Sequence, residues 1–268
     1  MLKDITLGQY FPGNSIAHKL DPRTKILLVT LYIIALFSAK GWMGYAVMAV
    51  TLAACVKVSH VGLRALVRGL KPLVFIIAFT GILNMFFTPD THYLWEWGIL
   101  RVSVKGIENA LFMVIRIMLL VMGTFLMTYT TSPIRLTDGL ESLLNPLKKI
   151  HVPVHELAMM MAIALRFIPT LIEETDKIMS AQKARGADFE TGNIFRRAKA
   201  LVPILVPLFI SAFRRADELA TAMECRCYHG GEGRTALRVL RYKAADWLVL
   251  AAFLALTAGI IVLKKLGF

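Results

Sequence analysis

The sequence predicts an all-α polytopic membrane protein with about five transmembrane helices and a cytoplasmic-side region of long amphipathic helices. Of its 268 residues 57% are hydrophobic, and the mean hydropathy is +0.62, which is too apolar for an ordinary soluble domain. Apolar runs approach the ~20 residues that cross a bilayer. The charged region that precedes the last run also has helical periodicity.

Five apolar runs are candidate transmembrane helices. They cover 26–39, 42–58, 72–87, 110–131 and 246–263. We therefore expect an N-terminal membrane domain over 1–131 with four transmembrane helices, a charged region over 132–243 and a C-terminal transmembrane helix over 244–268. Arg116 lies within the fourth run, and we expect it to snorkel or to pair inside the bundle, because an unpaired charge there is costly.

The loops between these runs alternate in charge. Segments 1–25 and 57–71 together hold eight Lys and Arg residues. The positive-inside rule therefore places the N-terminus, the 57–71 loop and the 132–243 region in the cytoplasm. It also accounts for much of the formal charge of +13. Lys264 and Lys265 follow the last run on the opposite side and depart from the rule.

The 132–243 region contains 17 Lys and Arg and 12 Asp and Glu residues, yet it has strongly apolar stretches. Apolar residues recur there at helical spacing. We predict one long helix over 155–183, kinked at Pro169, and a second from about 195 to 227. A shorter amphipathic helix over 134–150 is interrupted near Pro146. Such helices suit a protein that lies at the membrane interface.

The two long predicted helices end alike. Shifting the first by 41 residues places Asp176 on Asp217 and Arg185 on Arg226, and in both the Arg follows the Asp by nine residues. Small residues flank each Arg: Ala184, Gly186, Cys225 and Cys227. Small neighbours let a helix end enter a groove, where a guanidinium can reach a carboxylate or carbonyl groups.

A purely structural interpretation of these ends remains open. The helix dipole favours an Arg in the last turn, and Gly186 is an ordinary residue after a helix end. Repetition of the whole pattern at one spacing makes docking to a partner as well supported as this structural interpretation.

The chain resembles the transmembrane T component of energy-coupling factor (ECF) transporters, a CbiQ-like family, in its shared-module branch. The resemblance covers nearly the whole chain. It rests on the opening DITLGQYFPGNS followed by HKLDPRTKI, on Ala184-Arg185-Gly186, on Cys225-Arg226-Cys227 and on the following Tyr228-His229-Gly230-Gly231. In the second Arg motif cysteines stand where the family more often has alanine, but they are also small.

The resemblance implies a non-catalytic coupling subunit of an ATP-driven importer for vitamins or other micronutrients, in the cell membrane. Region 132–243 would be a cytoplasmic coupling region in which two coupling helices cross in an X. Arg185 and Arg226 would each dock one ABC-type ATPase subunit, with Asp176 and Asp217 in support. A substrate-binding membrane subunit (S component), possibly one of several interchangeable ones, would contact Met159, Met160, Leu165, Ile168, Leu205 and Leu208. These methionines suit an adaptable surface, although packing or lipid contact explains them equally well.

Other classes of site have less support in the sequence. We expect no cofactor, no metal and no nucleic-acid partner. A metal or redox site at Cys225 and Cys227 would have only His229 nearby to complete it. The chain lacks a phosphate-binding loop motif, so we expect it not to be an enzyme. The alternative is a stand-alone permease or channel, and the transported solute cannot be read from the sequence.

Overall fold

A computed structural model describes residues 10–88, 93–97, 100–189, 193–230 and 239–265. The first part of the N-terminal motif, residues 4–9, lies outside these ranges. The chain divides into two units. We call Gly8–Leu140 with Leu240–Phe268 the helix bundle, and Met1–Leu7 with Glu141–Val239 the crossed-helix unit.

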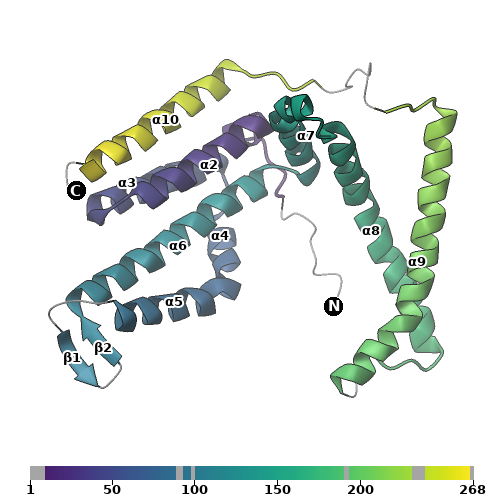
Figure 1. The fold of residues 1–268 in the computed structure, drawn as a ribbon, viewed down its shortest axis with the longest axis horizontal. Helices are drawn as coiled ribbons and strands as arrows, with labels where there is room; N and C mark the ends of the chain where they lie inside the picture. Colours follow the sequence, from purple (N-terminus) through teal and green to yellow (C-terminus); the bar gives the residue numbers. More distant parts are fainter. Residues whose placement is uncertain (1–9, 89–92, 98–99, 190–192, 231–238, 266–268) are drawn as a thin grey trace. The chain divides into compact units, whose positions relative to one another are not determined.

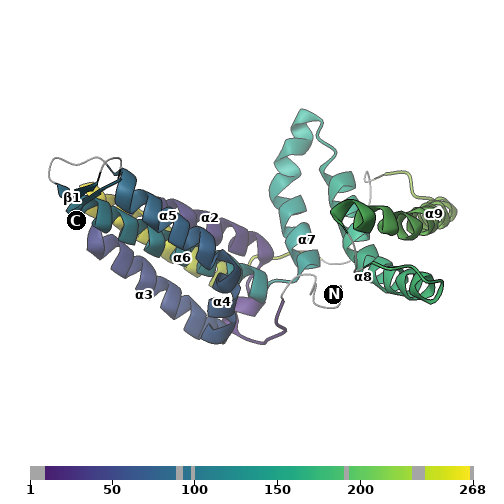
Figure 2. The ribbon, with the colours of Figure 1, turned by 90° about the horizontal axis from the view of Figure 1, so that it is seen from below.

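The helix bundle consists mainly of helices that run side by side (Figures 1 and 2). Its elements are α1 (Ile16–Lys19), α2 (Pro22–Ser38), α3 (Gly41–Ser59), α4 (Leu63–Leu70), η2 (Lys71–Leu73), α5 (Val74–Phe87), β1 (Tyr93–Trp97), β2 (Leu100–Ser103), α6 (Val104–Thr130), most of α7 (Pro133–Leu144) and α10 (Ala244–Lys265). Helix α6 contacts α2, α3, α4 and α5, and α10 packs on α2. The core therefore gathers around α6, where Leu36, Met48, Leu66 and Leu119 are buried.

Close packing in this bundle depends on small residues. A side chain at Gly123 of α6 would meet the ring of Tyr32 of α2 at 2.5 Å. Small residues allow membrane helices to approach closely, because lipid supplies no hydrophobic force that drives helices together. The Tyr32 hydroxyl donates to the Leu119 carbonyl at 3.1 Å, which satisfies a polar group in the core.

Within the described residues, five helical segments have the length and composition to cross a membrane, and four of them overlap predicted runs. They are Gly41–Ser59, Leu63–Phe87, Val104–Thr130, Val154–Ala184 and Ala244–Lys265. Helix α2, which contains most of the first predicted run, has 17 residues, at the short end of the range that crosses a bilayer. The stretch taken as a basic loop before residue 72 is helical as α4. The stretch taken as a loop before residue 110 holds an antiparallel β1–β2 hairpin and the start of α6.

The motif HKLDPRTKI fastens the bundle at the end where α2 begins. Asp21 caps α2 by accepting from the Arg23 amide at 2.9 Å, and Pro22 occupies the first turn, as expected for a helix start. The Lys25 ammonium donates to the Thr130 carbonyl at 2.8 Å. The Asp21 amide donates to the buried Asp246 carboxylate of α10 at 2.9 Å. Segments more than 100 residues apart therefore meet at this motif.

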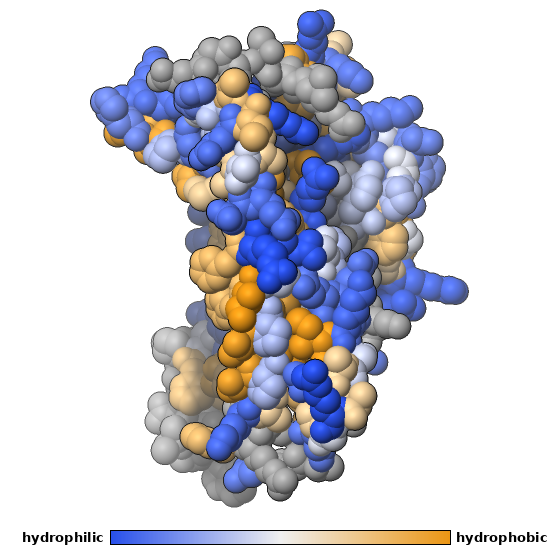
Figure 3. Space-filling model, turned by 90° about the vertical axis from the view of Figure 1, so that its right-hand side faces the viewer, coloured by the Kyte–Doolittle hydropathy of each residue, from blue (hydrophilic) through white to orange (hydrophobic). Residues whose placement is uncertain are grey.

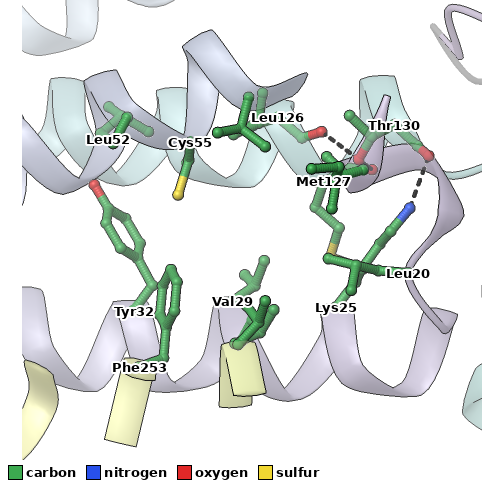
Figure 4. A pocket seen from close by; sticks show the side chains of 17 residues that line it. Leu20, Lys25, Val29, Tyr32, Leu52, Cys55, Leu126, Met127, Thr130 and Phe253 are labelled. Carbon is green, nitrogen blue, oxygen red and sulfur yellow. Dashed lines mark hydrogen bonds between the residues drawn. The ribbon is translucent and has the colours of Figure 1, made fainter. Parts of the chain in front are cut away.

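An apolar cavity of about 280 Å³ lies among α1, α2, α3, α6 and α10. Figure 4 shows the side chains that line it, including Tyr32, Cys55 and Met127, with Lys25 at one end. Because Lys25 is bonded to Thr130 and Thr131, its polar head is already satisfied. The cavity is a packing feature of the bundle.

The crossed-helix unit contains the end of α7, η3 (Asn145–Ile150), α8 (Val154–Ala184) and α9 (Ile194–Cys225). Both long helices agree closely with the predicted ranges. The break near Pro146 is the change from α-helix to the 3-10 helix η3. Helix α8 continues through Pro169, and α9 continues through Pro203 and Pro207. The Nδ1 atom of His155 is hydrogen-bonded to the Oε1 atom of Glu141 at 2.8 Å, and this bond links the end of α7 to the start of α8.

Candidate functional site: the ends of two crossed helices

The two Arg residues occupy equivalent positions at the ends of α8 and α9. Arg185 follows Ala184, the last residue of α8, and Arg226 follows Cys225, the last residue of α9. The next residue has a left-handed backbone in both cases, with φ of 87° at Gly186 and 54° at Cys227. The likeness seen in the sequence is therefore a likeness of backbone conformation.

The hydrogen bonds that close the two helices are also the same. In α8 the Gly186 amide donates to the Lys183 carbonyl at 3.0 Å, and the Ala187 amide donates to the Gln182 carbonyl at 3.0 Å. In α9 the amides of Cys227 and Tyr228 donate to the carbonyls of Glu224 and Met223 at 2.8 and 3.0 Å. This pair of bonds defines a Schellman motif. Each Arg is held on a sharply ended, well-defined turn.

All six predicted docking residues are exposed: Ala184, Arg185, Gly186, Cys225, Arg226 and Cys227. Among the described residues, nothing lies within 4 Å of a side chain built at Gly186. Neither Arg side chain has a hydrogen bond or an ion pair with the described residues. Both guanidinium groups are therefore available to another molecule.

The predicted supporting carboxylates also occupy equivalent places. Asp176 is half-buried on α8 and Asp217 is exposed on α9. Their backbone carbonyls accept from Ser180 at 2.7 Å and from Thr221 at 2.9 Å. Ser180 and Thr221 are themselves 41 residues apart. The repeat thus includes a hydroxyl that the sequence comparison did not use.

The two helices are bridged at a third pair of equivalent positions. Arg215 of α9 donates to Glu174 of α8 at 2.9 Å, and Ser211 also donates to Glu174. The 41-residue shift places Glu174 on Arg215. Each bridging residue lies 11 residues before its Arg, or about 16 Å along an α-helix. Figure 1 shows the helices crossing in opposite directions.

The charge at this crossing is balanced. The Glu174 carboxylate and the Arg215 guanidinium lie 2.9 Å apart, so their opposite formal charges offset each other where the helices meet.

The residues predicted to contact a substrate-binding subunit lie on the same two helices. Met160 and Leu205 are exposed, while Met159, Leu165, Ile168 and Leu208 are half-buried. Other apolar residues of α9 are more strongly exposed. Phe209 and Ile210 lie within the predicted contact face 201–210, whereas Phe195 and Phe213 lie outside it. Phe209 and Phe213, four residues apart, stack with ring centroids 6.4 Å apart. Their helical spacing was a signal available in the sequence.

Figure 3 shows this side of the molecule. Hydrophobic residues gather in a band along part of the face, and hydrophilic residues border the band. The exposed large apolar residues of α9 lie between residues 195 and 213, and several charged residues follow from Arg214 onwards. An exposed apolar surface of this kind indicates contact with lipid or with another protein.

The cysteines show no sign of a metal or disulfide site. Cys55, Cys225 and Cys227 are all free thiols. The His229 ring bonds to the Cys227 carbonyl at 2.9 Å. Within the described parts of the chain, no group of three His, Cys, Asp or Glu residues could hold a metal ion.

Comparisons with known proteins show which family the chain belongs to. A family model described as cobalt transport protein matches residues 13–237. A protein of Ruminiclostridium cellulolyticum, named energy-coupling factor transporter transmembrane protein EcfT, is 52% identical over 268 residues, with both chains fully covered. Proteins of the same name are 56% identical in Thermosediminibacter oceani, covering 95% of this chain and 94% of that one, and 46% identical in Bacillus subtilis, covering 98% and 100%. The chain belongs to the cobalt transport protein (CbiQ) family, as a multi-pass transmembrane component of the energy-coupling factor transporter type.

Proposed function

We propose that the chain is the non-catalytic coupling subunit of an ATP-driven importer and that its two Arg motifs dock two ABC-type ATPase subunits on the cytoplasmic side. The repeated helix ending carries this proposal. Arg185 and Arg226 occupy the same place in two Schellman motifs, equally far from one crossing. Two like subunits would need two like docking sites, and this repeat supplies them.

The chemistry of each end supports docking into an acidic or carbonyl-lined groove. An exposed guanidinium can make paired, charge-assisted hydrogen bonds to a carboxylate. The small residues beside each Arg leave room for the groove walls. The left-handed turn directs the chain away immediately after the Arg, so the helix end itself can enter the groove.

The crossing suggests how motion passes between the two sites. Glu174, Ser211 and Arg215 join α8 to α9, so a displacement of either helix end turns both helices about one joint. The apolar band of α9 would then carry this motion to a substrate-binding membrane subunit. We infer that this subunit imports a vitamin or another micronutrient and can be exchanged for others, as the resemblance to the shared-module branch implies.

The decisive experiment is an Arg185→Glu and Arg226→Glu double variant. Charge reversal should abolish co-purification of the ATPase subunits and stop uptake, while the chain still inserts into the membrane. The matched control is Lys177→Glu with Arg214→Glu, which reverses two exposed charges on the same helices away from their ends. Unchanged uptake and co-purification in the first variant would refute docking through these residues.

A second experiment separates the two partners. Phe209→Asp with Phe213→Asp places charge on the apolar band of α9. We expect the substrate-binding subunit to be lost while the ATPase subunits still co-purify. Loss of both kinds of partner would instead mean that α9 had been distorted, and retention of both would exclude this band as the contact surface.

A further inference from the structure

A basic cavity of about 730 Å³ opens in the helix bundle near the hairpin end of α6. Four basic residues and one acidic residue line it: Lys40, Lys105, Arg116, Lys264 and Glu108. The basic residues come from the α2–α3 connection, from two turns of α6 and from the end of α10. Folding therefore brings cations from distant parts of the chain to one place.

Arg116 is held within the cavity without a carboxylate. Its Nε atom donates to the Tyr45 hydroxyl at 2.9 Å, and its guanidinium carbon lies 5.6 Å from the centre of the Phe37 ring. Among the described residues no carboxylate lies within 4.0 Å of this guanidinium. A guanidinium has five N–H donors, and one phenol oxygen leaves several of them for a ligand.

The position of the cavity conflicts with a simple topology rule. The charge bias of the loops places this end of the bundle on the outer side of the membrane, where Lys and Arg are normally scarce. Lys264, one of the lining residues, departs from the positive-inside rule in the sequence. Cations gathered in one cavity repel one another, and a bound anion would offset that repulsion.

The remaining lining fits an oxyanion at the membrane surface. Asn84 and Asn109 line the same cavity. The Asn84 amide nitrogen already donates to the Thr80 carbonyl at 2.9 Å, which leaves it one N–H, and the Asn109 amide can add further neutral donors. Trp42 lies with its ring centroid 4.9 Å from that of Phe112, another lining residue. Tryptophan favours the interface between headgroups and hydrocarbon, and we therefore expect the cavity to lie at the depth of lipid phosphates.

We propose that this cavity is a binding site for a phosphate group, supplied by an anionic phospholipid headgroup of the outer leaflet. Arg116 provides a fixed fork of donors at the inner wall, and Lys40 and Lys264 close over the phosphate from two sides. A soluble phosphate compound offers the same chemistry, so the test has an arm for each source.

The lipid arm compares two double variants of the full-length chain. Lys40→Gln with Lys264→Gln removes two lining charges. Lys57→Gln with Lys265→Gln removes two exposed charges that do not line the cavity. Each protein is equilibrated with phosphatidylglycerol and phosphatidylcholine in detergent, and retained lipid is measured by native mass spectrometry. We expect the first variant to retain phosphatidylglycerol about thirtyfold more weakly, from the usual contribution of two basic residues near anionic lipid, and the control to match the original chain.

The soluble arm adds inorganic phosphate to delipidated protein and follows its melting temperature. Stabilisation of the original chain, but not of the lining variant, without preferential lipid retention would assign the site to a soluble phosphate. Equal behaviour of the lining variant and the control in both arms would overturn the proposal. If the double variant fails to insert, Lys264→Gln against its neighbour Lys265→Gln makes the same comparison.

Discussion

At the scale of single residues, the two helix ends differ at one position that matters for backbone strain. Gly186 and Cys227 both have positive φ. Glycine adopts this conformation freely, whereas a residue with a side chain is strained there by about 1–2 kcal/mol. The turn at Cys227 therefore carries backbone strain that the equivalent turn at Gly186 does not.

Substitutions at these two positions should change the stability of the two turns in opposite directions. Gly186→Ala should weaken the end of α8 by about 1 kcal/mol and speed exchange of the Ala187 amide about fivefold. Cys227→Gly should slow exchange of the Tyr228 amide by up to the same factor. Hydrogen exchange measures both, with Cys225→Ala, in the last helical position, as the control. Equal exchange in all variants would mean that backbone strain does not govern these turns.

The cysteines of the second motif allow a direct test of docking. Cys225 and Cys227 are exposed, whereas Cys55 is partly buried beside the apolar cavity. A maleimide reagent should rapidly label two thiols of the isolated chain, and Cys225→Ser with Cys227→Ser should remove this fast labelling. In the assembled transporter both thiols should be protected. Equally fast labelling before and after assembly would show that the end of α9 stays uncovered.

At the scale of the helices, Glu174 of α8 contacts Ser211 and Arg215 of α9 at the crossing. The side chains of Arg215 and Glu174 are 37% and 23% exposed, so their bridge is partly screened by water. Such pairs contribute only about 0.2–1 kcal/mol. The bridge therefore determines where the two helices cross, and it contributes little to the stability of the crossed-helix unit.

Reversing the pair should separate these two roles. Glu174→Arg or Arg215→Glu alone places like charges at the crossing and should reduce uptake strongly. The double reversal restores opposite charges and should recover most of the activity. Thermal stability should change little in all three variants, because the pair is weak. Failure of the double variant to recover uptake, with its stability intact, would exclude the bridge as the joint between the helices.

At the scale of the whole molecule, the C-terminal helix is fastened to the start of the chain. Asp246 is only 1% exposed and accepts from the amides of Asp21 and Lys243 at 2.9 and 2.8 Å. It thereby closes the first turn of α10 and holds the first turn of α2. A buried carboxylate of this kind stabilises the fold mainly because its removal would leave both amide N–H groups without a hydrogen-bond acceptor.

Asp246→Ala should destabilise the helix bundle by about 2–3 kcal/mol. Asp246→Asn keeps an acceptor oxygen and should cost less. Thermal unfolding in detergent measures both, and Glu218→Ala, an exposed carboxylate on α9, is the control that should leave stability unchanged. Equal melting temperatures for Asp246→Ala and the control would exclude this fastening role.

The sequence predicted the long helices and the duplicated Arg motifs well, because both depend on local patterns. Amphipathic periodicity gave α8 and α9 to within a few residues. Prediction was weaker at the membrane runs, where composition alone separates a helix from its loops. Residues 63–71 looked like a basic loop but fold as α4 and the start of η2, since Leu66 and Leu70 are buried while Arg64, Arg68 and Lys71 are exposed.

By itself the sequence determined that this protein crosses a membrane and that two helices end in the same Arg-centred motif, because apolar run length and residue spacing are properties of the chain. The tertiary structure decided which positions face each other. The contacts of Glu174 with Arg215, of Asp21 with Asp246 and of Tyr45 with Arg116 join residues far apart in the sequence. No local pattern encodes such pairs, since they depend on the packing of whole helices.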